Sequence, residues 1–357
     1  MLDIKITKTT HPKEKPQDES KLGFGKQFSD HMFLMDYTAG EGWHDARIVP
    51  YGPWEMDPAT TVFHYAQEIF EGMKAYRTAD GKIQLFRPDC NANRFNDSAD
   101  RLGMPPIPPE DFVQAVKALV DVDRDWVPHS DGASLYIRPF CIATDVGLGV
   151  HAAKHYRFAI ICAPSGAYYA EGLDPVRIYV EDEYIRAAPG LTGFTKCGGN
   201  YAASLLGEYK GVENGCEQVC FVDAATKTYL EELGGMNMMA VHKDGHVETP
   251  SLTGNILPGV TRRSLIQLLQ DKGHDVVETM IALDQLLEDI KSGEVTEVFA
   301  CGTAAIITPI GRFKSEKFDV AVADGGSGKL TCELRDELLG IQLGEVEDPH
   351  NWMWKVC

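Results

Sequence analysis

A lysine in a glycine-rich segment is the strongest candidate for covalent chemistry in this sequence. Lys196 lies in LTGFTKCGGNYAASL (191–205), shortly before Gly198 and Gly199, which let the backbone approach a bound group closely. A helix is predicted to begin at Asn200. A neutral lysine amine held near a helix N-terminus can form a Schiff base with a carbonyl compound. Taken alone, the segment fits an ordinary solvated lysine better.

Two adjacent glutamates form the second candidate. Glu231 and Glu232 precede a glycine pair and an apolar strand in YLEELGGMNMMAV (229–241). Side chains alternate along a strand, so the two carboxylates are predicted to point to opposite faces, and at least one of them inward. A buried carboxylate needs a cationic or N–H partner. A protonated pyridine nitrogen is one partner that would explain the burial, and a solvated pair at a strand end is the alternative.

Two further segments offer donors for an anion. In NILPGVTRRSLIQLL (255–269) a helix is predicted to begin at Val260 and Thr261, whose free N–H groups and hydroxyl suit an anion. In FACGTAAIITPI (299–310) a turn at 302–304 is predicted where a strand ends. Each segment alone also fits plain capping. Together with the lysine and the buried carboxylate, they indicate a pyridoxal phosphate cofactor.

Other nucleotide-binding chemistry is disfavoured. Residues 147–152 match G-x-G-x-x-A, but no convincing helix follows, and no acidic residue stands about 20 residues on after a second strand. The segment GGSGKLT (325–331) resembles a phosphate-binding loop but has Leu330 where Ser or Thr is required.

Metal and hydrolase chemistry are disfavoured as well. His151 and His155 are four residues apart, as are His242 and His246, but neither pair carries the Glu of H-E-x-x-H. No metal site is therefore predicted. The sequence also has no G-x-S-x-G segment of a serine hydrolase.

The predicted elements that position these residues alternate between strands and helices in the second half. Apolar and β-branched runs predict strands at 134–143, 156–163, 176–187, 218–224, 235–243 and 297–303. Helical periodicity predicts helices at 109–122, 200–210, 261–272, 281–292 and 331–341. A hairpin turn is predicted at KDG (243–245). The pattern indicates an α/β (α+β) protein of two domains, divided in the Pro- and Gly-containing stretch 163–175.

Length and charge narrow the range of functions. The 357 residues suggest two domains, and a net charge of −19 disfavours nucleic acid and anionic membranes as partners. No apolar run is long enough to span a membrane. Residues 1–22 are predicted to form a polar arm, poorly ordered at its start, and not a secretory signal. The nine scattered cysteines indicate reduced thiols in a cytoplasmic protein.

A set of longer motifs is specific to one family. The motifs are FSDHMF (28–33), FHYAQEIFEGMKAY (63–76), LFRPDCNANRF (85–95), SLYIRPF (134–140), KCGGNY (196–201), EELGGMN (231–237), LPGVTRRS (257–264) and GTAA (302–305). From about Phe28 to its C-terminus the chain resembles the branched-chain amino acid aminotransferases, pyridoxal-phosphate enzymes of fold type IV. The resemblance implies a smaller N-terminal α/β domain and a larger C-terminal domain with a mixed, barrel-like sheet. We expect a polar arm at 1–22, the small domain at 23–165, an interdomain loop at 166–176 and the large cofactor domain at 177–357.

The resemblance implies pyridoxal 5′-phosphate as the cofactor and a role for each cofactor residue. Lys196 would bind the cofactor covalently and then move a proton between the substrate Cα and the cofactor C4′. Glu232 would bond the pyridine nitrogen and keep it protonated, and Tyr201 would contact the ring O3′. The phosphate would be bound by Arg94, the N–H groups of Val260 and Thr261, and the Thr303 hydroxyl.

The resemblance also implies the substrates. They would be L-leucine, L-isoleucine or L-valine with 2-oxoglutarate, and a reversible ping-pong transfer would give branched-chain 2-oxo acids and L-glutamate. The aliphatic side chain would lie against an aromatic wall of Phe28, Tyr65, Phe70 and Tyr136. The turn at Thr303 and Ala304 would receive the α-carboxylate near the Tyr136 hydroxyl. Arg138 would bind the γ-carboxylate of glutamate.

A second subunit would complete the pocket. In the family, a loop of the partner subunit closes over the substrate, and DVGLGVHA (145–152) matches that loop. Leu148 and Val150 would face the substrate, so a homodimer is expected.

Two departures from the mammalian enzymes bear on specificity and regulation. Gly235 stands where those enzymes have Thr, which removes one hydroxyl from the pocket. Ala305 and Thr308 replace their CxxC, so no thiol redox switch is expected. A D-amino acid transaminase or an aminodeoxychorismate lyase would share Lys196 and Glu232 and stays an alternative. Nothing in the sequence favours a non-enzymatic binding module.

Overall fold

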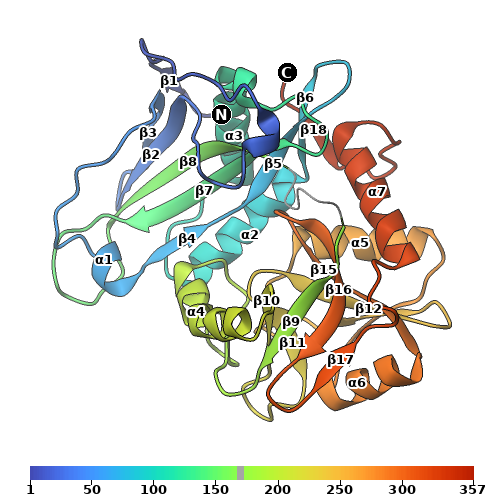
Figure 1. Ribbon diagram of the computed structural model, residues 1–357. Helices are drawn as coiled ribbons and strands as arrows, with labels where there is room; N and C mark the ends of the chain where they lie inside the picture. Colours follow the sequence, from blue (N-terminus) through green and yellow to red (C-terminus); the bar gives the residue numbers. More distant parts are fainter. Residues whose placement is uncertain (167–172) are drawn as a thin grey trace. The chain divides into compact units, whose positions relative to one another are not determined.

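The computed structural model describes residues 1–166 and 173–357 and divides the chain into two compact units (Figure 1). Unit 1 comprises Met1–Ala170, Thr195–Gly198 and Gly340–Cys357, and unit 2 comprises Glu171–Phe194 and Gly199–Leu339. Neither unit is therefore a continuous piece of chain. Within the predicted interdomain loop 166–176, residues 167–172 lie outside the described part.

Unit 1 is built on a nine-stranded mixed sheet. The strand order is β1 (Lys5–Ile6), β3 (Gly42–Pro50), β2 (His31–Thr38), β8 (His155–Ser165), β7 (Ser134–Ala143), β5 (Met73–Arg77), β6 (Ile83–Phe86) and β18 (Met353–Lys355), with β4 (Glu68–Phe70) paired to β7. The helices are α1 (Val62–Tyr65), α2 (Pro88–Arg101) and α3 (Pro109–Val122), with short 3-10 turns at Glu19–Lys21 and Arg124–Trp126.

Helices α2 and α3 pack against each other, and α3 lies against β2 and β8 (Figure 1). The predicted helix at 109–122 is confirmed, and Phe112 and Leu119 on its apolar face are fully buried. The Phe112 ring centroid lies 5.6 Å from that of Phe158 on β8. Because β8 pairs with β7 along its whole length, this core fixes the strand that carries Tyr136.

The N-terminal arm is ordered from its start, and the prediction that it is not was wrong. Lys5–Ile6 forms β1, which pairs in parallel with β3, and the N–H of Thr7 donates to the carbonyl of Ile48 at 2.9 Å. The N–H of Leu2 donates to Gln114 Oε1 at 2.8 Å. The physical reason is that β3 offers unpaired N–H and C=O groups on one edge, which a polar segment can satisfy as well as an apolar one.

The C-terminal residues pair with unit 1. Strand β18 is antiparallel to β6, with Trp354 opposite Leu85. The structure therefore assigns Gly340–Cys357 to unit 1, whereas the predicted domains place this tail with the cofactor domain.

Unit 2 is built on a second nine-stranded mixed sheet. The strand order is β11 (Leu230–Leu233), β10 (Gln218–Val222), β9 (Val176–Glu181), β16 (Ile306–Lys314), β15 (Val295–Gly302), β12 (Asn237–His242), β13 (Val247–Pro250) and β14 (Val276–Thr279), with β17 (Asp319–Ala321) paired to β16. Its helices are α4 (Gly198–Glu213), α5 (Val260–Asp271), α6 (Leu283–Ser292) and α7 (Lys329–Leu343), of which the first and last extend across the unit boundaries.

The predicted helices and strands of unit 2 are confirmed with small shifts, except that the strand predicted at 176–187 ends at Glu181. It ends early because Glu181 Oε1 accepts the N–H groups of Glu183 and Tyr184, which turns the chain out of the ladder. The predicted turn at 243–245 is confirmed, since it joins antiparallel β12 and β13.

Two mixed sheets with packed helices confirm the predicted α/β (α+β) class. All nine cysteines are free, and six of them are buried. Within residues 1–166 and 173–357, no helix is long and apolar enough to cross a membrane.

Candidate active site

Lys196 is held by the backbone and side chains of unit 1. Its N–H donates to Ser98 Oγ at 2.9 Å, and its carbonyl accepts the N–H of Phe70 at 2.9 Å. The Lys196 amine lies 4.9 Å from the centroid of the Phe70 ring. Beyond the lysine, the N–H of Gly198 donates to Glu68, and burial raises the pKa of that carboxyl. The structure thus brings together Lys196 and Phe70, two residues that the sequence predicts for one site.

Arg94 is anchored by a carboxylate that the sequence analysis missed. Glu71 is fully buried and accepts Arg94 Nε at 2.7 Å and Nη2 at 2.9 Å, a paired geometry typical of strong ion pairs. The Asn91 amide also donates to Glu71 at 2.7 Å. Burial would raise the pKa of Glu71, but Arg94, Lys196 and Asn91 together hold it below its usual value. An acidic residue inside the apolar segment IFEGM was the available signal.

An aromatic cavity of about 300 Å³ lies in unit 1. The predicted Phe28, Tyr136 and Arg138 line it, together with Phe24 and residues 161–163. Arg138 Nη2 donates to the Tyr136 hydroxyl at 3.0 Å, and its guanidinium lies 4.6 Å from the centroid of the Phe70 ring. Arg138 Nε is buried and has no hydrogen-bond partner within the described residues. An apolar cavity with one guanidinium in its wall suits an aliphatic group and a carboxylate.

The loop 145–152 is tied to one of the predicted aromatic residues. The Tyr65 hydroxyl donates to the carbonyl of Leu148 at 2.5 Å. The side chains of Leu148 and Val150 are 69% and 81% exposed, which is unusual for apolar residues near each other on a short loop. The structure therefore connects Tyr65 with this loop but leaves the apolar tips of the loop uncovered.

In unit 2, Glu232 lies on β11 and is 1% exposed. Its Oε2 is 3.0 Å from Arg186 Nη1 and accepts the N–H of Leu257 at 3.0 Å. The neighbouring Glu231 accepts the Asn255 amide at 2.7 Å, and burial raises the pKa of Glu231. Both glutamates are thus buried, which confirms that at least one points inward. Arg186 was missed, since its loop offers no motif.

Helix α5 begins without a side-chain cap. Its N-cap is Gly259, which has no side chain that could bond the first N–H groups of the helix. A Cβ at Gly259 would lie 2.1 Å from Asn237 Oδ1, so this position is closed to larger residues. Val260 and Thr261 are buried, and their N–H groups precede the first intrahelical bond. This donor set fits the phosphate of pyridoxal phosphate.

Two further predicted residues lie close together in unit 2. A Cβ at Gly235 would lie 3.9 Å from the ring of Tyr201. A Cβ at Gly302 would lie 3.2 Å from Met236 and 3.7 Å from the carbonyl of Gly235, so the strand end before the 303–305 turn adjoins the EELGGMN segment. Thr303 and Ala304 lie in this turn, between β15 and β16, as predicted.

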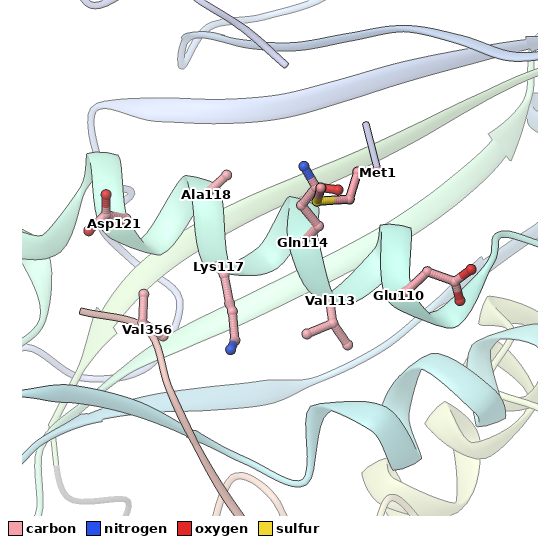
Figure 2. A pocket seen from close by; sticks show the side chains of 8 residues that line it. All are labelled: Met1, Glu110, Val113, Gln114, Lys117, Ala118, Asp121 and Val356. Atoms are coloured by element: carbon pink, nitrogen blue, oxygen red, sulfur yellow. The ribbon is translucent and has the colours of Figure 1, made fainter. Parts of the chain in front are cut away.

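A larger hollow of about 490 Å³ runs along α3, and Figure 2 shows it. Side chains of α3, with Met1 and Val356, line it, and none of the residues predicted for the site is among them (Figure 2). Size alone therefore does not identify the candidate site; the chemistry of the lining residues does.

A family model and curated relatives both match this chain to aminotransferases. The family model of amino-transferase class IV matches residues 68–313. The branched-chain-amino-acid aminotransferase of Mycolicibacterium smegmatis is 48% identical over 359 residues, 99% of this chain and 98% of its own. Branched-chain-amino-acid transaminase 1 of Bacillus subtilis is 50% identical over 354 residues, 99% of both chains.

Solved structures agree with these relatives. The branched-chain amino acid aminotransferase of Escherichia coli has a TM-score of 0.77 at 28% identity, covering 92% of this chain and 99% of its own. A second branched-chain amino acid aminotransferase (T.th.), complexed with N-(5′-phosphopyridoxyl)-L-glutamate, has a TM-score of 0.75 at 27% identity, covering 90% of this chain and 98% of its own.

Proposed function

Because the chain belongs to the amino-transferase class IV family, we propose that it is a pyridoxal-phosphate-dependent branched-chain amino acid aminotransferase. The reaction transfers the amino group of L-leucine, L-isoleucine or L-valine to 2-oxoglutarate. The products are a branched-chain 2-oxo acid and L-glutamate, and the transfer is reversible. The observation that carries this proposal is the aromatic cavity with Arg138 in its wall. A ping-pong enzyme must accept leucine and glutamate in one pocket, and this cavity offers an apolar wall and a guanidinium.

The residues proposed to bind the cofactor are those that the family resemblance implies. Pyridoxal phosphate, when bound, supplies an electron sink for the negative charge that develops at the substrate Cα. Arg94, the N–H groups of Val260 and Thr261, and the Thr303 hydroxyl bind its phosphate. This assignment is supported by the N-terminus of α5, where no side chain caps the first N–H groups. Tyr201 contacts the ring O3′.

The side chains of Lys196 and Glu232 are proposed to move and to hold the protons of the reaction. The Lys196 amine would hold the cofactor and would move a proton between the substrate Cα and the cofactor C4′. Glu232 keeps the pyridine nitrogen protonated. Its pairing with Arg186 supports this role, because a nearby guanidinium favours the ionised carboxylate.

The substrate is oriented by its carboxylates and its side chain. The Thr303–Ala304 turn and the Tyr136 hydroxyl receive the α-carboxylate, and Arg138 receives the γ-carboxylate of glutamate. Phe28, Tyr65, Phe70 and Tyr136 surround the aliphatic side chain, and each CH₂ buried there contributes about 0.8 kcal/mol. Gly235 leaves room in the pocket without adding a hydroxyl.

The active form is a cytoplasmic homodimer in this proposal. The exposed Leu148 and Val150 support it, because the corresponding loop of a second subunit would cover a pocket and bury both side chains. The free thiols support a reducing compartment, and the net charge of −19 argues against nucleic acid as a partner.

The first test is Lys196→Ala. Turnover of L-leucine with 2-oxoglutarate is expected to fall by roughly 10²- to 10⁴-fold, because no amine remains to carry the proton. Cofactor still binds through its phosphate, but the absorption spectrum lacks the visible band of lysine-bound pyridoxal. Lys329→Ala, at a side chain that is 89% exposed, serves as the control and keeps full activity.

The same assay separates the alternatives. The wild-type visible band should shift to the ultraviolet when L-leucine is added, as the cofactor takes up the amino group. Activity on D-alanine alone would identify a D-amino acid transaminase, and pyruvate release from aminodeoxychorismate would identify a lyase. Normal turnover in Lys196→Ala would refute the role of the lysine.

A further inference from the structure

The hairpin of β12 and β13 carries metal-ligating side chains that the proposed reaction does not use. His242 ends β12, His246 follows the turn, and Glu248 lies on β13. One nitrogen or oxygen atom of each lies within 4.8 Å of the others. Sequence spacing disfavours a metal here because neither histidine is followed by a glutamate in an H-E-x-x-H pattern. The fold supplies the carboxylate from the opposite strand instead.

The three side chains are spaced slightly wider than the ligands of a zinc site. His242 Nε2 lies 3.3 Å from Glu248 Oε2, and His246 Nε2 lies 4.0 Å from Glu248 Oε1. Metal–ligand bonds of about 2.0–2.2 Å in a tetrahedral site place ligand atoms roughly 3.3–3.5 Å apart. The imidazole rings are stacked, with centroids 3.9 Å apart and planes 16° from parallel, so the in-plane lone pairs of the two rings run nearly parallel. At least one imidazole must therefore rotate out of the stack to bring both nitrogens onto one ion.

The state of the two histidines is a second, independent observation. His242 Nε2 is buried and has no hydrogen-bond partner within the described residues, although the imidazole is only 12% exposed. His246 Nδ1 lies 2.6 Å from Asp244 Oδ1. Because an ionised carboxylate can only accept, His246 Nδ1 donates to Asp244, which fixes the orientation of the ring with Nε2 toward Glu248. A carboxylate on the far nitrogen is the usual support of a metal-binding histidine.

The surrounding charges also favour a cation. Asp244 and Glu248 are the nearest carboxylates, and Asp244 accepts the backbone N–H of His246 at 3.1 Å. Two stacked imidazoles repel each other if both are protonated, whereas one cation shared by two neutral rings removes that repulsion. The nearby His274 is engaged elsewhere, with Nδ1 2.7 Å from the carbonyl of Gly245.

We propose that His242, His246 and Glu248 bind one zinc-class divalent cation, with a fourth position left to water. Two imidazoles and one carboxylate select zinc over magnesium or calcium, which prefer oxygen ligands. The ion ties β12 to β13 across the turn and stabilises this end of the unit 2 sheet. This site is separate from the proposed transamination chemistry.

The test determines how many Zn²⁺ ions each chain binds and with what affinity. The cofactor-loaded protein is first treated with EDTA and dialysed. Isothermal titration and elemental analysis should give one Zn²⁺ per chain, with no competition from excess Mg²⁺. His246→Asn and Glu248→Gln should each lose this ion. Asp244→Asn should weaken Zn²⁺ binding by about 10- to 100-fold, because it releases His246 from its preferred orientation.

The controls separate this site from other zinc ligands in the chain. His11→Asn removes an exposed histidine outside the cluster and should bind Zn²⁺ as the wild type does. Unchanged turnover of L-leucine in every variant shows that each is folded. A wild-type protein that binds no Zn²⁺, or equal Zn²⁺ affinity in wild type, His246→Asn and Glu248→Gln, would overturn the proposal.

Discussion

Glu232 illustrates how one buried side chain can depend on another that is invisible in sequence motifs. Both Glu232 and Arg186 have side chains that are 2% exposed, and each supplies the charge that the other needs. Arg186 also donates to the carbonyl of Asn255 at 3.2 Å, so its guanidinium is fixed on more than one side. In the proposed reaction Arg186 is a positioning residue that keeps Glu232 ionised and aligned.

The prediction at this scale is Glu232→Gln. Turnover is expected to fall by roughly 10²- to 10³-fold with little change in KM, because the charge is needed as the reaction proceeds and not for substrate binding. The midpoint of thermal unfolding should also fall, because Arg186 is left buried without its counter-charge. Steady-state kinetics and calorimetry measure both effects.

Glu231→Gln is the matched control. It alters the adjacent buried carboxylate, which bonds Asn255, and should leave turnover close to that of the wild type. A change confined to KM in Glu232→Gln would contradict the proposed role. Equal losses of turnover in both variants would show that any change in this strand has the same effect.

How far the residues of the site could be predicted depends on whether their partners are close in sequence. Lys196 and Glu232 stand in short segments whose glycines and apolar neighbours make them candidates, although each segment alone also fits an ordinary solvated residue. Glu71 and Arg94 are 23 residues apart, on a strand end and a helix, and only the folded chain shows that they pair. Long-range ion pairs of this kind leave no local pattern, which is why Glu71 and Arg186 were missed.

At the scale of elements, the start of helix α5 is constrained by the side chain of Asn237. Asn237 Nδ2 donates to the carbonyl of Leu257 at 3.0 Å, and its Oδ1 fills the space where a Cβ at Gly259 would lie. The amide of Asn237 therefore cannot turn away without losing a buried hydrogen bond. With glycine at the N-cap, no capping side chain bonds the first N–H groups of α5, so these groups can donate to an anion.

Gly259→Ala is the prediction at this scale. The added methyl group should lower the free energy of unfolding by about 1–3 kcal/mol, as overpacking does in cores, and weaken pyridoxal phosphate binding by displacing the start of α5. Chemical denaturation and cofactor titration measure the two effects. Gly52→Ala, where nothing lies within 4 Å of the new Cβ, should be neutral in both. Unchanged cofactor affinity in Gly259→Ala would argue against a phosphate at this helix end.

Elements with a strong apolar period could be predicted closely, and short polar ones could not. The helix at 109–122 shows its buried face in the sequence, and the strand at 134–143 shows a run of β-branched and aromatic residues. Strands β1 and β18 are short, and their pairing partners β3 and β6 are distant in sequence. Their formation depends on an available sheet edge and not on their own composition.

At the scale of the whole molecule, helix α4 presents an apolar face to solvent. Leu205, Tyr209 and Val212 follow a helical spacing and are 49%, 67% and 68% exposed. Exposed apolar side chains on one helix face are typical of surfaces that bind another chain. This face, together with the exposed tips of loop 145–152, supports the proposed homodimer.

The prediction for the assembly is Val212→Glu. A charge in a buried interface is costly, so the proposed dimer should dissociate at concentrations where the wild type stays paired. Light scattering should then report the mass of one chain instead of two, and turnover should fall as the partner loop is lost. Met280→Glu, at a residue that is 51% exposed outside this face, is the control. A wild-type protein with the mass of one chain at full activity would contradict the dimer.

The pairing of β18 with β6 has a consequence during synthesis. Strand β6 of the unit 1 sheet is translated before unit 2, and its partner β18 is translated after unit 2. At about 5–20 residues per second, β6 waits on the order of tens of seconds for its partner. For that time the nascent chain carries an open strand edge, the kind of surface on which a second copy can pair wrongly. Newly made chains are therefore expected to need chaperone protection of this edge until β18 emerges.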